Sequence, residues 1–128
     1  MGRVKFTRDY VIKSSPTILY NFLSTPSGLA QWFADHVDSF EKNFSFFWDG
    51  TEEKAEMLEK EDNVYIRFQM EDADDDKEYL EFRIQKSPVT GDTVLVITDF
   101  ADDYDLEDQQ QLWDSQVDGL VARVGGRN

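Results

Sequence analysis

The sequence of 128 residues predicts a single α+β domain, in which a curved antiparallel sheet wraps around a long C-terminal helix. Between residues 43 and 100, apolar residues alternate with polar ones in several short segments, as they do in half-buried strands. A long helical pattern follows, over about residues 107–124. An antiparallel meander cannot bury its apolar face alone, and this helix is the only expected element long enough to cover it.

The first expected element is a strand over about residues 5–12, followed by two short helices. Phe6, Tyr10 and Ile12 lie on one face of this strand. Each helix is expected to begin at a Ser or Thr that precedes a proline, because such a residue can cap a helix and proline suits its first turn. The inward-facing apolar residues of the two helices are Ile18, Leu19, Phe22, Leu23, Leu29, Trp32 and Phe33.

The middle of the chain is expected to form strands throughout. They cover residues 43–48, 53–60, 64–70, 79–85 and 93–100, with a seventh strand near residues 37–40. Asp49-Gly50 is a strong signal for a hairpin turn. The segment 93–100 is apolar on both faces as far as Asp99, which predicts a central strand covered on both sides.

The final helix presents an apolar stripe to the sheet, and its other residues allow two further expectations. Asp114 and Asp118 are like charges at i and i+4, so we expect them to face water. Gly119 costs about 1 kcal/mol relative to alanine inside a helix. A close approach of the first or second helix would explain this glycine, and Gly119→Leu should then destabilise the fold.

The net charge of −14 excludes several classes of partner. Phosphate backbones and anionic membrane surfaces would be repelled, so we expect neither nucleic acid binding nor membrane insertion. No segment resembles a signal peptide or a membrane span, which predicts a cytoplasmic protein. The absence of cysteine excludes disulfides and thiolate metal sites. Residues 71–78 and 99–108 together carry −11 of the charge.

Neither the one histidine nor the acidic segments provide a recognisable catalytic or metal site. His36 follows the second helix, where we expect it on the surface or packed in a loop. Catalysis by histidine usually needs an orienting carboxylate and a nucleophile, and the sequence supplies no such set. Asp72, Asp74 and Asp76 begin a pattern like a calcium loop, but the expected glycine and glutamate are missing. We therefore expect no cofactor or metal, and we expect a binding protein rather than an enzyme.

Four charged residues occupy odd-numbered positions in the predicted strands and could therefore lie on one face of the sheet, namely Arg67, Glu81, Arg83 and Asp99. Arg67 and Glu81 would be cross-strand neighbours if the register allows. Such a ladder could hold a polar ligand inside a cavity, or it could form ordinary ion pairs on a solvated outer face. Asp99 ends an apolar strand, so we expect its carboxylate to have a partner.

Six segments carry a family resemblance that spans nearly the whole chain: SPTILYNFLSTPSGLAQWFAD (15–35), FSFFWDG (44–50), YIRF (65–68), EFRI (81–84), VITDFAD (96–102) and LWDSQVDGLVARVG (112–125). Together they resemble the START-like, or SRPBCC, superfamily with its helix-grip fold. The nearer resemblance is to the branch related to activators of the heat-shock chaperone ATPase, and within it to small bacterial START-like domain proteins. The resemblance implies about seven strands around the C-terminal helix, two small helices at one end, and a cavity between helix and sheet.

The resemblance implies a cavity that in many members of the family holds an apolar ligand, although some members are enzymes. Because the sequence supplies no catalytic set, we expect binding of a small hydrophobic or amphipathic ligand without catalysis. The alternative is a chaperone-activator-like domain that binds a protein partner through its acidic surface. The oligomeric state stays open, and a dimer is compatible with the family. The candidate ligand-binding residues are apolar and inward-facing, and they would serve equally well in a solid core: Trp32, Phe33, Phe46, Trp48, Met57, Phe68, Phe82, Trp113 and Val117.

Overall fold

Seven strands form one antiparallel sheet in the computed structural model, which describes residues 3–71, 73 and 77–124. The strands are β1 (Arg3–Ile12), β2 (His36–Phe40), β3 (Asn43–Trp48), β4 (Thr51–Glu61), β5 (Tyr65–Met70), β6 (Leu80–Lys86) and β7 (Thr93–Asp102). The helices are α1 (Pro16–Ser24), α2 (Pro26–Leu29) and α3 (Leu106–Val124), with a 3₁₀ turn, η1 (Asp103–Asp105), before α3. This is the α+β helix-grip architecture that the sequence predicts.

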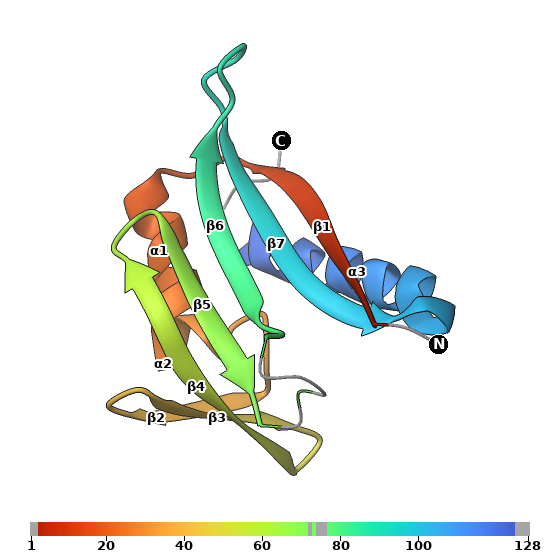
Figure 1. The fold of residues 1–128 in the computed structure, drawn as a ribbon. Helices are drawn as coiled ribbons and strands as arrows, with labels where there is room; N and C mark the ends of the chain where they lie inside the picture. The colour runs from red at the N-terminus through yellow and green to blue at the C-terminus, as the bar shows by residue number, and fades with distance from the viewer. Residues whose placement is uncertain (1–2, 72, 74–76, 125–128) are drawn as a thin grey trace.

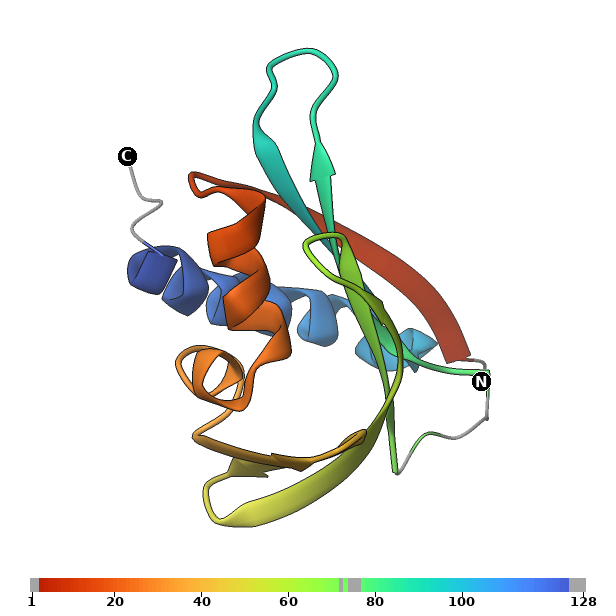
Figure 2. The same cartoon turned by 90° about the vertical axis from the view of Figure 1, so that its left-hand side faces the viewer.

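The sheet curves around the helices, with all three helices on its concave side (Figures 1 and 2). Its strand order is β1-β7-β6-β5-β4-β3-β2, so neighbours are consecutive in sequence except at one place. There the first strand pairs with the last, from Arg3 opposite Asp102 to Ile12 opposite Thr93. This pairing places the beginning of β1 beside the beginning of α3.

The two short helices begin as their sequences predict. The Ser15 Oγ accepts a hydrogen bond from the backbone N–H of Ile18 at 3.2 Å, and the Thr25 Oγ1 accepts one from Gly28 at 3.0 Å. Gly28 is required by close packing, because a Cβ there would lie 2.1 Å from the carbonyl oxygen of Asn21. The joint between α1 and α2 therefore has no room for a side chain at this position.

Three expectations about the interior are wrong. Ile18, expected to face inward from α1, is 52% exposed. Gly119 is exposed, and a Cβ at this position would meet no atom within 4 Å, so a close approach does not explain it. The strand β7 is covered on its inner face, whereas Val94 and Val96 on its outer face stay partly exposed. The apolar residues on the outer face of β7 are therefore partly exposed, and no second layer covers them in the part of the chain that the structure describes.

The core lies between the concave face of the sheet and the three helices. It combines the inward residues of every strand with the apolar stripe of α3, including Val117 and Leu120. The Asp49-Gly50 turn has positive φ at both residues, 49° and 80°, as the predicted hairpin requires. Within residues 3–71, 73 and 77–124, none of the helices combines the length and apolar content needed to cross a membrane.

Candidate functional site

An aromatic cluster brings together most of the residues predicted to bind a ligand. Phe33 is at its centre, with its ring stacked on Trp113 at 5.7 Å between centroids and edge-on to Phe46 at 5.0 Å and Trp48 at 5.3 Å. Phe82 contacts Phe33, Trp113 and Phe68 in the same cluster. These rings fill space by touching one another, and such pairs are favourable beyond the area they bury.

The three tryptophans of this region each donate their indole N–H to a different acceptor. Trp32 donates to the carbonyl of Phe22 and Trp48 to the carbonyl of Phe33, both at 2.7 Å. Trp113 instead donates to a side chain, the Oδ2 of Asp99, at 3.0 Å. A buried tryptophan usually needs such a partner, so the three hydrogen bonds fix the orientations of the rings.

The remaining predicted ligand residues take different positions. Trp32, Phe33 and Trp48 also border a hollow of about 380 Å³ that includes Gln116 of α3. Met57 borders another hollow, of about 450 Å³, between α1 and the strands β4 and β5. Phe46 and Phe68 are fully buried, and Val117 is nearly so.

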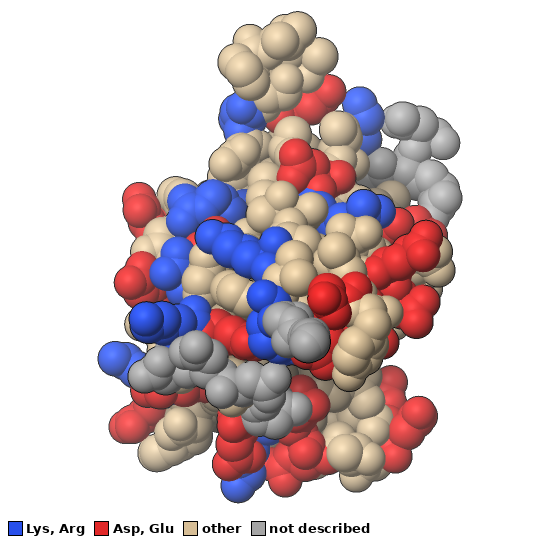
Figure 3. Space-filling view, turned by 45° about the vertical axis from the view of Figure 1, so that its right-hand side comes forward, with Lys and Arg blue, Asp and Glu red and all other residues tan. Residues whose placement is uncertain are grey.

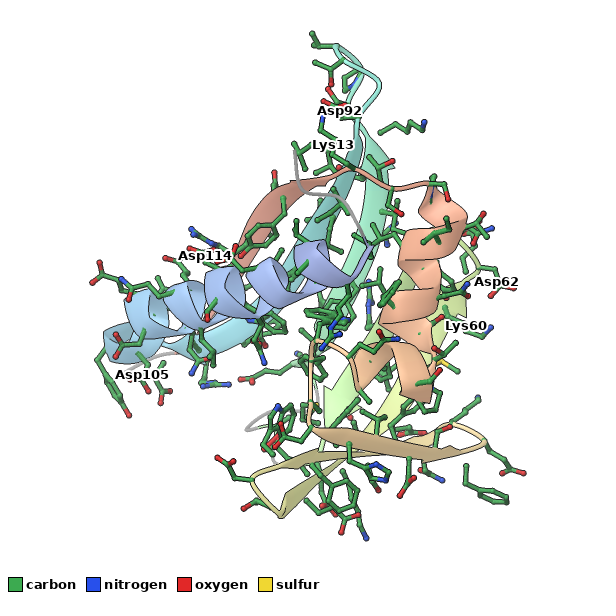
Figure 4. All side chains as sticks on the ribbon, turned by 180° about the vertical axis from the view of Figure 1, so that it is seen from behind. Lys13, Lys60, Asp62, Asp92, Asp105 and Asp114 are labelled. Atoms are coloured by element: carbon green, nitrogen blue, oxygen red, sulfur yellow. The ribbon has the colours of Figure 1, made fainter. Side chains whose placement is uncertain are left out.

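A further hollow, of about 430 Å³, opens between the sheet and the beginning of α3. We call it the open-end hollow. Its apolar lining includes Met70 and Leu80, both on the inner face of the sheet, and its polar lining includes Arg3, Glu78, Asp99, Asp102 and Asp105. Figure 4 shows Asp105 at this end of α3. The opening therefore joins an apolar floor to a mainly acidic rim.

Asp99 lies where the open-end hollow meets the aromatic cluster. Burial raises the pKa of the Asp99 carboxyl above its ordinary value, although hydrogen bonds from the Phe100 backbone and the Trp113 indole act in the opposite direction. The expectation that Asp99 has a partner is confirmed, and that partner is Trp113. The carboxylate thus connects the surface opening to the ring that stacks on Phe33.

Arg3 holds the acidic rim together. It donates from Nε and Nη2 to the two carboxylate oxygens of Glu78, at 2.9 and 2.8 Å, and Asp102 lies 3.4 Å from its Nη1. Such a two-point contact fixes a carboxylate more firmly than a single bond does. Glu78 is only 6% exposed, so its charge is neutralised by Arg3 where water has little access.

The ladder of four charged residues is confirmed for three members and wrong for one. Arg67 lies opposite Glu81 in the register, and Glu81 accepts hydrogen bonds from Arg67 and Arg83. Asp99 lies on the other face of the sheet, because Glu81 pairs with Thr98 and the next residue points inward. The prediction failed for Asp99 because the alternation of odd and even residues between the two faces of β6 does not continue through the turn into β7.

Other polar expectations differ in the structure. Asp114 accepts hydrogen bonds from Arg8, at 2.7 Å, and from Tyr10, at 2.6 Å, so it joins α3 to β1 rather than simply facing water (Figure 4). His36 is exposed at the start of β2, with Asp38 at 3.1 Å. Asp72, Asp74 and Asp76 lie outside the described residues. Among the residues that are described, no group of three or more metal-ligating side chains is assembled.

Comparison with protein families matches residues 1–126 to the START-like superfamily domain. The chain belongs to the START-like superfamily. This agrees with the curved seven-stranded sheet, the long C-terminal helix and the short helices after β1. Comparison with curated proteins finds no match.

Solved structures of the superfamily share the fold over nearly their full length. The solution structure of BfR322 from Bacteroides fragilis is 35% identical, with a TM-score of 0.68, covering 100% of this chain and 95% of that one. The Aha1 dimer from Colwellia psychrerythraea is 16% identical, with a TM-score of 0.77 and coverage of 94% and 96%. Protein MLL2253 from Mesorhizobium loti is 16% identical, with a TM-score of 0.75 and coverage of 93% and 95%. The two more distant structures support the fold alone.

Sequence reasoning found the aromatic cluster but missed the open-end hollow. The alternating pattern of the strands predicted at 64–70 and 79–85 places Met70 and Leu80 on their apolar faces, and Asp99 was expected to have a partner, yet nothing in the sequence placed the three around one opening. Arg3 and Glu78 gave no local signal, because they are 75 residues apart and meet only because β7 pairs with β1 on one side and with β6 on the other. The pairing of the first strand with the last is the information that would have indicated the open-end hollow.

Proposed function

We propose that the domain binds a small amphipathic molecule at the open-end hollow without catalysing a reaction. The observation that carries this proposal is an opening of about 430 Å³ between sheet and helix, with Met70 and Leu80 beneath an acidic rim. A hollow of this size is within the range of small-molecule sites, and it offers both an apolar surface and polar groups, although here the polar groups predominate. The apolar part of the ligand would lie on Met70 and Leu80.

The charge of the rim favours some head groups over others. Asp99, Asp102, Asp105 and Glu78 border the hollow, with Arg3 as a basic group already bonded to Glu78. A carboxylate head group would be repelled here, whereas a hydroxyl or an ammonium group would not. We therefore expect neutral or cationic amphiphiles to bind more tightly than fatty acids of the same length.

The predicted aromatic residues have an indirect part in this proposal. Trp113 donates to Asp99 at the back of the hollow, and its ring stacks on Phe33. A ligand that reaches Asp99 would change the environment of the Trp113 indole and leave those of Trp32 and Trp48 unchanged. The aromatic cluster around Phe33 would then form the wall behind the ligand, and a longer ligand would reach it only if Trp113 moves.

The three indole N–H groups provide the test. Decylamine, decanol and decanoate are titrated separately into ¹⁵N-labelled protein, and the indole resonances are followed by NMR. We expect decylamine and decanol to shift the Trp113 resonance in a saturable way and decanoate to do so more weakly. Native mass spectrometry of the freshly purified protein should show an additional mass that is lost on unfolding.

Two matched variants distinguish this hollow from the one beneath α1. Met70→Trp adds bulk to the open-end hollow and should abolish the shift of Trp113. Met57→Trp makes the same change in the other hollow and should leave the shift unchanged. Equal losses in both variants, or tightest binding of decanoate, would contradict the proposal.

The second candidate function is binding of a protein partner through the acidic surface around η1. Asp103, Glu107 and Asp108 are exposed there, and Tyr104 among them is 79% exposed. An exposed aromatic residue surrounded by acids suits a basic partner surface. Absence of any additional mass, together with unshifted indole resonances for all three probes, would favour this alternative.

A further inference from the structure

The outer face of the sheet carries a set of side chains that the ligand proposal does not use. Arg67 and Arg83 both bond to Glu81, and each guanidinium lies over a tyrosine ring, Arg67 over Tyr79 at 4.3 Å and Arg83 over Tyr65 at 4.4 Å. Lys5 of β1 lies 5.7 Å from the ring of Tyr79. We call these five residues around Glu81 the outer-face patch.

The carboxylate at its centre is buried, which is uncommon on a face without a covering layer. Glu81 is only 6% exposed because the two arginines cover it. Although burial opposes ionisation, hydrogen bonds from Arg83 and Arg67 keep the pKa of Glu81 below its ordinary value. The two guanidinium groups are thus held in fixed positions by a charged partner and an aromatic ring each.

Fixed guanidinium groups are ready to bind a second acceptor. The bonds to Glu81 use Nε and one N–H of Nη2 of each arginine, so among the described residues the Nη1 group and the second N–H of Nη2 are left to donate to a further acceptor. The arginine side chains are 29% and 32% exposed. Because their rotamers are already restricted, a new partner would not have to order them, which lowers the entropic cost of binding.

The charge and apolar surroundings of the patch indicate the chemistry of that partner. Two arginines bind one buried carboxylate and Lys5 lies over the neighbouring ring of Tyr79, while Glu59 at the edge accepts a hydrogen bond from Tyr65 at 2.5 Å. In the view of Figure 3, Lys and Arg side chains form a band across the middle, while Asp and Glu are more frequent towards the margins. Beside Arg83 lies Val96, its partner in the register, and with Val94 it forms a partly exposed apolar row on β7.

We propose that the outer-face patch is a docking site for an acidic segment of a partner protein, whose carboxylates pair with Lys5, Arg67 and Arg83 and whose apolar side chains lie on Val94 and Val96. Arginine suits this task because its planar group can bind a carboxylate at two points. A positive patch on a chain of net charge −14 also orients an acidic segment towards this one face.

The test uses a fluorescently labelled peptide of alternating glutamate and leucine, with anisotropy measured at low ionic strength. Peptides in which glutamine or lysine replaces glutamate serve as probes of charge. We expect saturable binding of the glutamate peptide alone, weakened by added salt. Equal binding of the glutamine peptide would overturn the proposal, because an apolar surface would then be sufficient.

The variants avoid leaving a buried charge without its partners. Lys5→Glu changes an exposed residue and should weaken peptide binding at least about tenfold, as loss of one charge-assisted contact would. The triple variant Arg67→Gln, Glu81→Gln and Arg83→Gln removes the whole ion cluster and should abolish binding. Arg123→Gln removes one positive charge from the exposed side of α3 and should have no effect. Unchanged binding by Lys5→Glu would overturn the proposal.

Two further measurements address other occupants of the patch. In the first, inorganic phosphate and unlabelled peptide are compared as competitors of the labelled peptide. If phosphate displaces the labelled peptide at the same concentration as unlabelled peptide does, the patch is a simple anion site and the proposal is overturned. Analytical ultracentrifugation of the protein alone tests for a second copy on this face. A dimer that the triple variant converts to a monomer would show that the occupant is the chain itself, and this would also overturn the proposal.

Discussion

The two ends of the space between sheet and helices are built differently. At the closed end, next to α1 and α2, aromatic rings contact one another and the indoles of Trp32 and Trp48 donate to backbone carbonyls. At the open end, next to the start of α3, carboxylates and Arg3 surround a hollow. The bond from Trp113 to Asp99 marks the boundary between them. The comparison indicates that one end supplies stability, while the other leaves polar groups accessible for binding.

The largest effect is expected from Phe33→Ala at the closed end. Phe33 contacts four other rings besides Trp32, and its removal should lower the free energy of unfolding by about 3–5 kcal/mol. Urea denaturation followed by circular dichroism measures this. Met70→Ala at the open end should cost clearly less, since Met70 is only partly buried. Equal decreases in the free energy of unfolding for the two variants would mean that the two ends do not differ in packing.

Gly28→Ala tests the tight joint between α1 and α2. The new Cβ would lie 2.1 Å from a backbone oxygen and 2.7 Å from the Cα of Phe22, so the helices must separate. We expect a loss of about 1–3 kcal/mol in the free energy of unfolding, the usual cost of overpacking. A variant as stable as the wild type in the same denaturation experiment would show that α2 can shift without cost.

Gly119→Ala is the matched change where there is free space. Since a Cβ meets no atom within 4 Å, alanine should stabilise α3 by up to about 1 kcal/mol through its higher helix propensity. Gly119→Leu should likewise not destabilise the fold, contrary to what the sequence suggests. Thermal unfolding of the glycine and alanine forms measures the difference, and a lower melting temperature for alanine would contradict it.

The smallest effect is expected at Asp99 and should appear as a pH trend. Because burial raises the pKa of Asp99 in the folded state, the wild type is stabilised when this carboxyl is protonated. That stabilisation is lost as the pH rises through the raised pKa. Asp99→Asn should therefore be more stable than the wild type at pH 7, and the difference should shrink towards pH 4. A difference that grows on acidification would show that ionised Asp99 is stabilising.

Local pattern was sufficient for the elements and the faces of single strands. Side chains alternate along a strand, so Phe6 and Ile12 could be placed inside without knowing the partner strand. The capping residues Ser15 and Thr25 likewise act within one turn. The same reasoning failed for Asp99, because its face depends on the turn that precedes β7.

The open-end hollow could not be predicted because no local pattern describes it. It exists where the beginning of β1, the end of β7 and the start of α3 meet, and its lining residues are far apart in sequence. Asp114 shows the same limit. Its bonds to Arg8 and Tyr10 cross from the last helix to the first strand, and only the tertiary arrangement brings them together.

The pairing of β1 with β7 also has a consequence for biosynthesis. Arg3 precedes its partner in the register, Asp102, by 99 residues, so β1 is synthesised well before the strand it pairs with. Strands β2 to β6 can pair with their neighbours as they emerge from the ribosome, whereas β1 must wait for the last strand. Contacts of such sequence separation slow folding, so closure of the sheet should be the late step, during which β1 is exposed to chaperones and proteases.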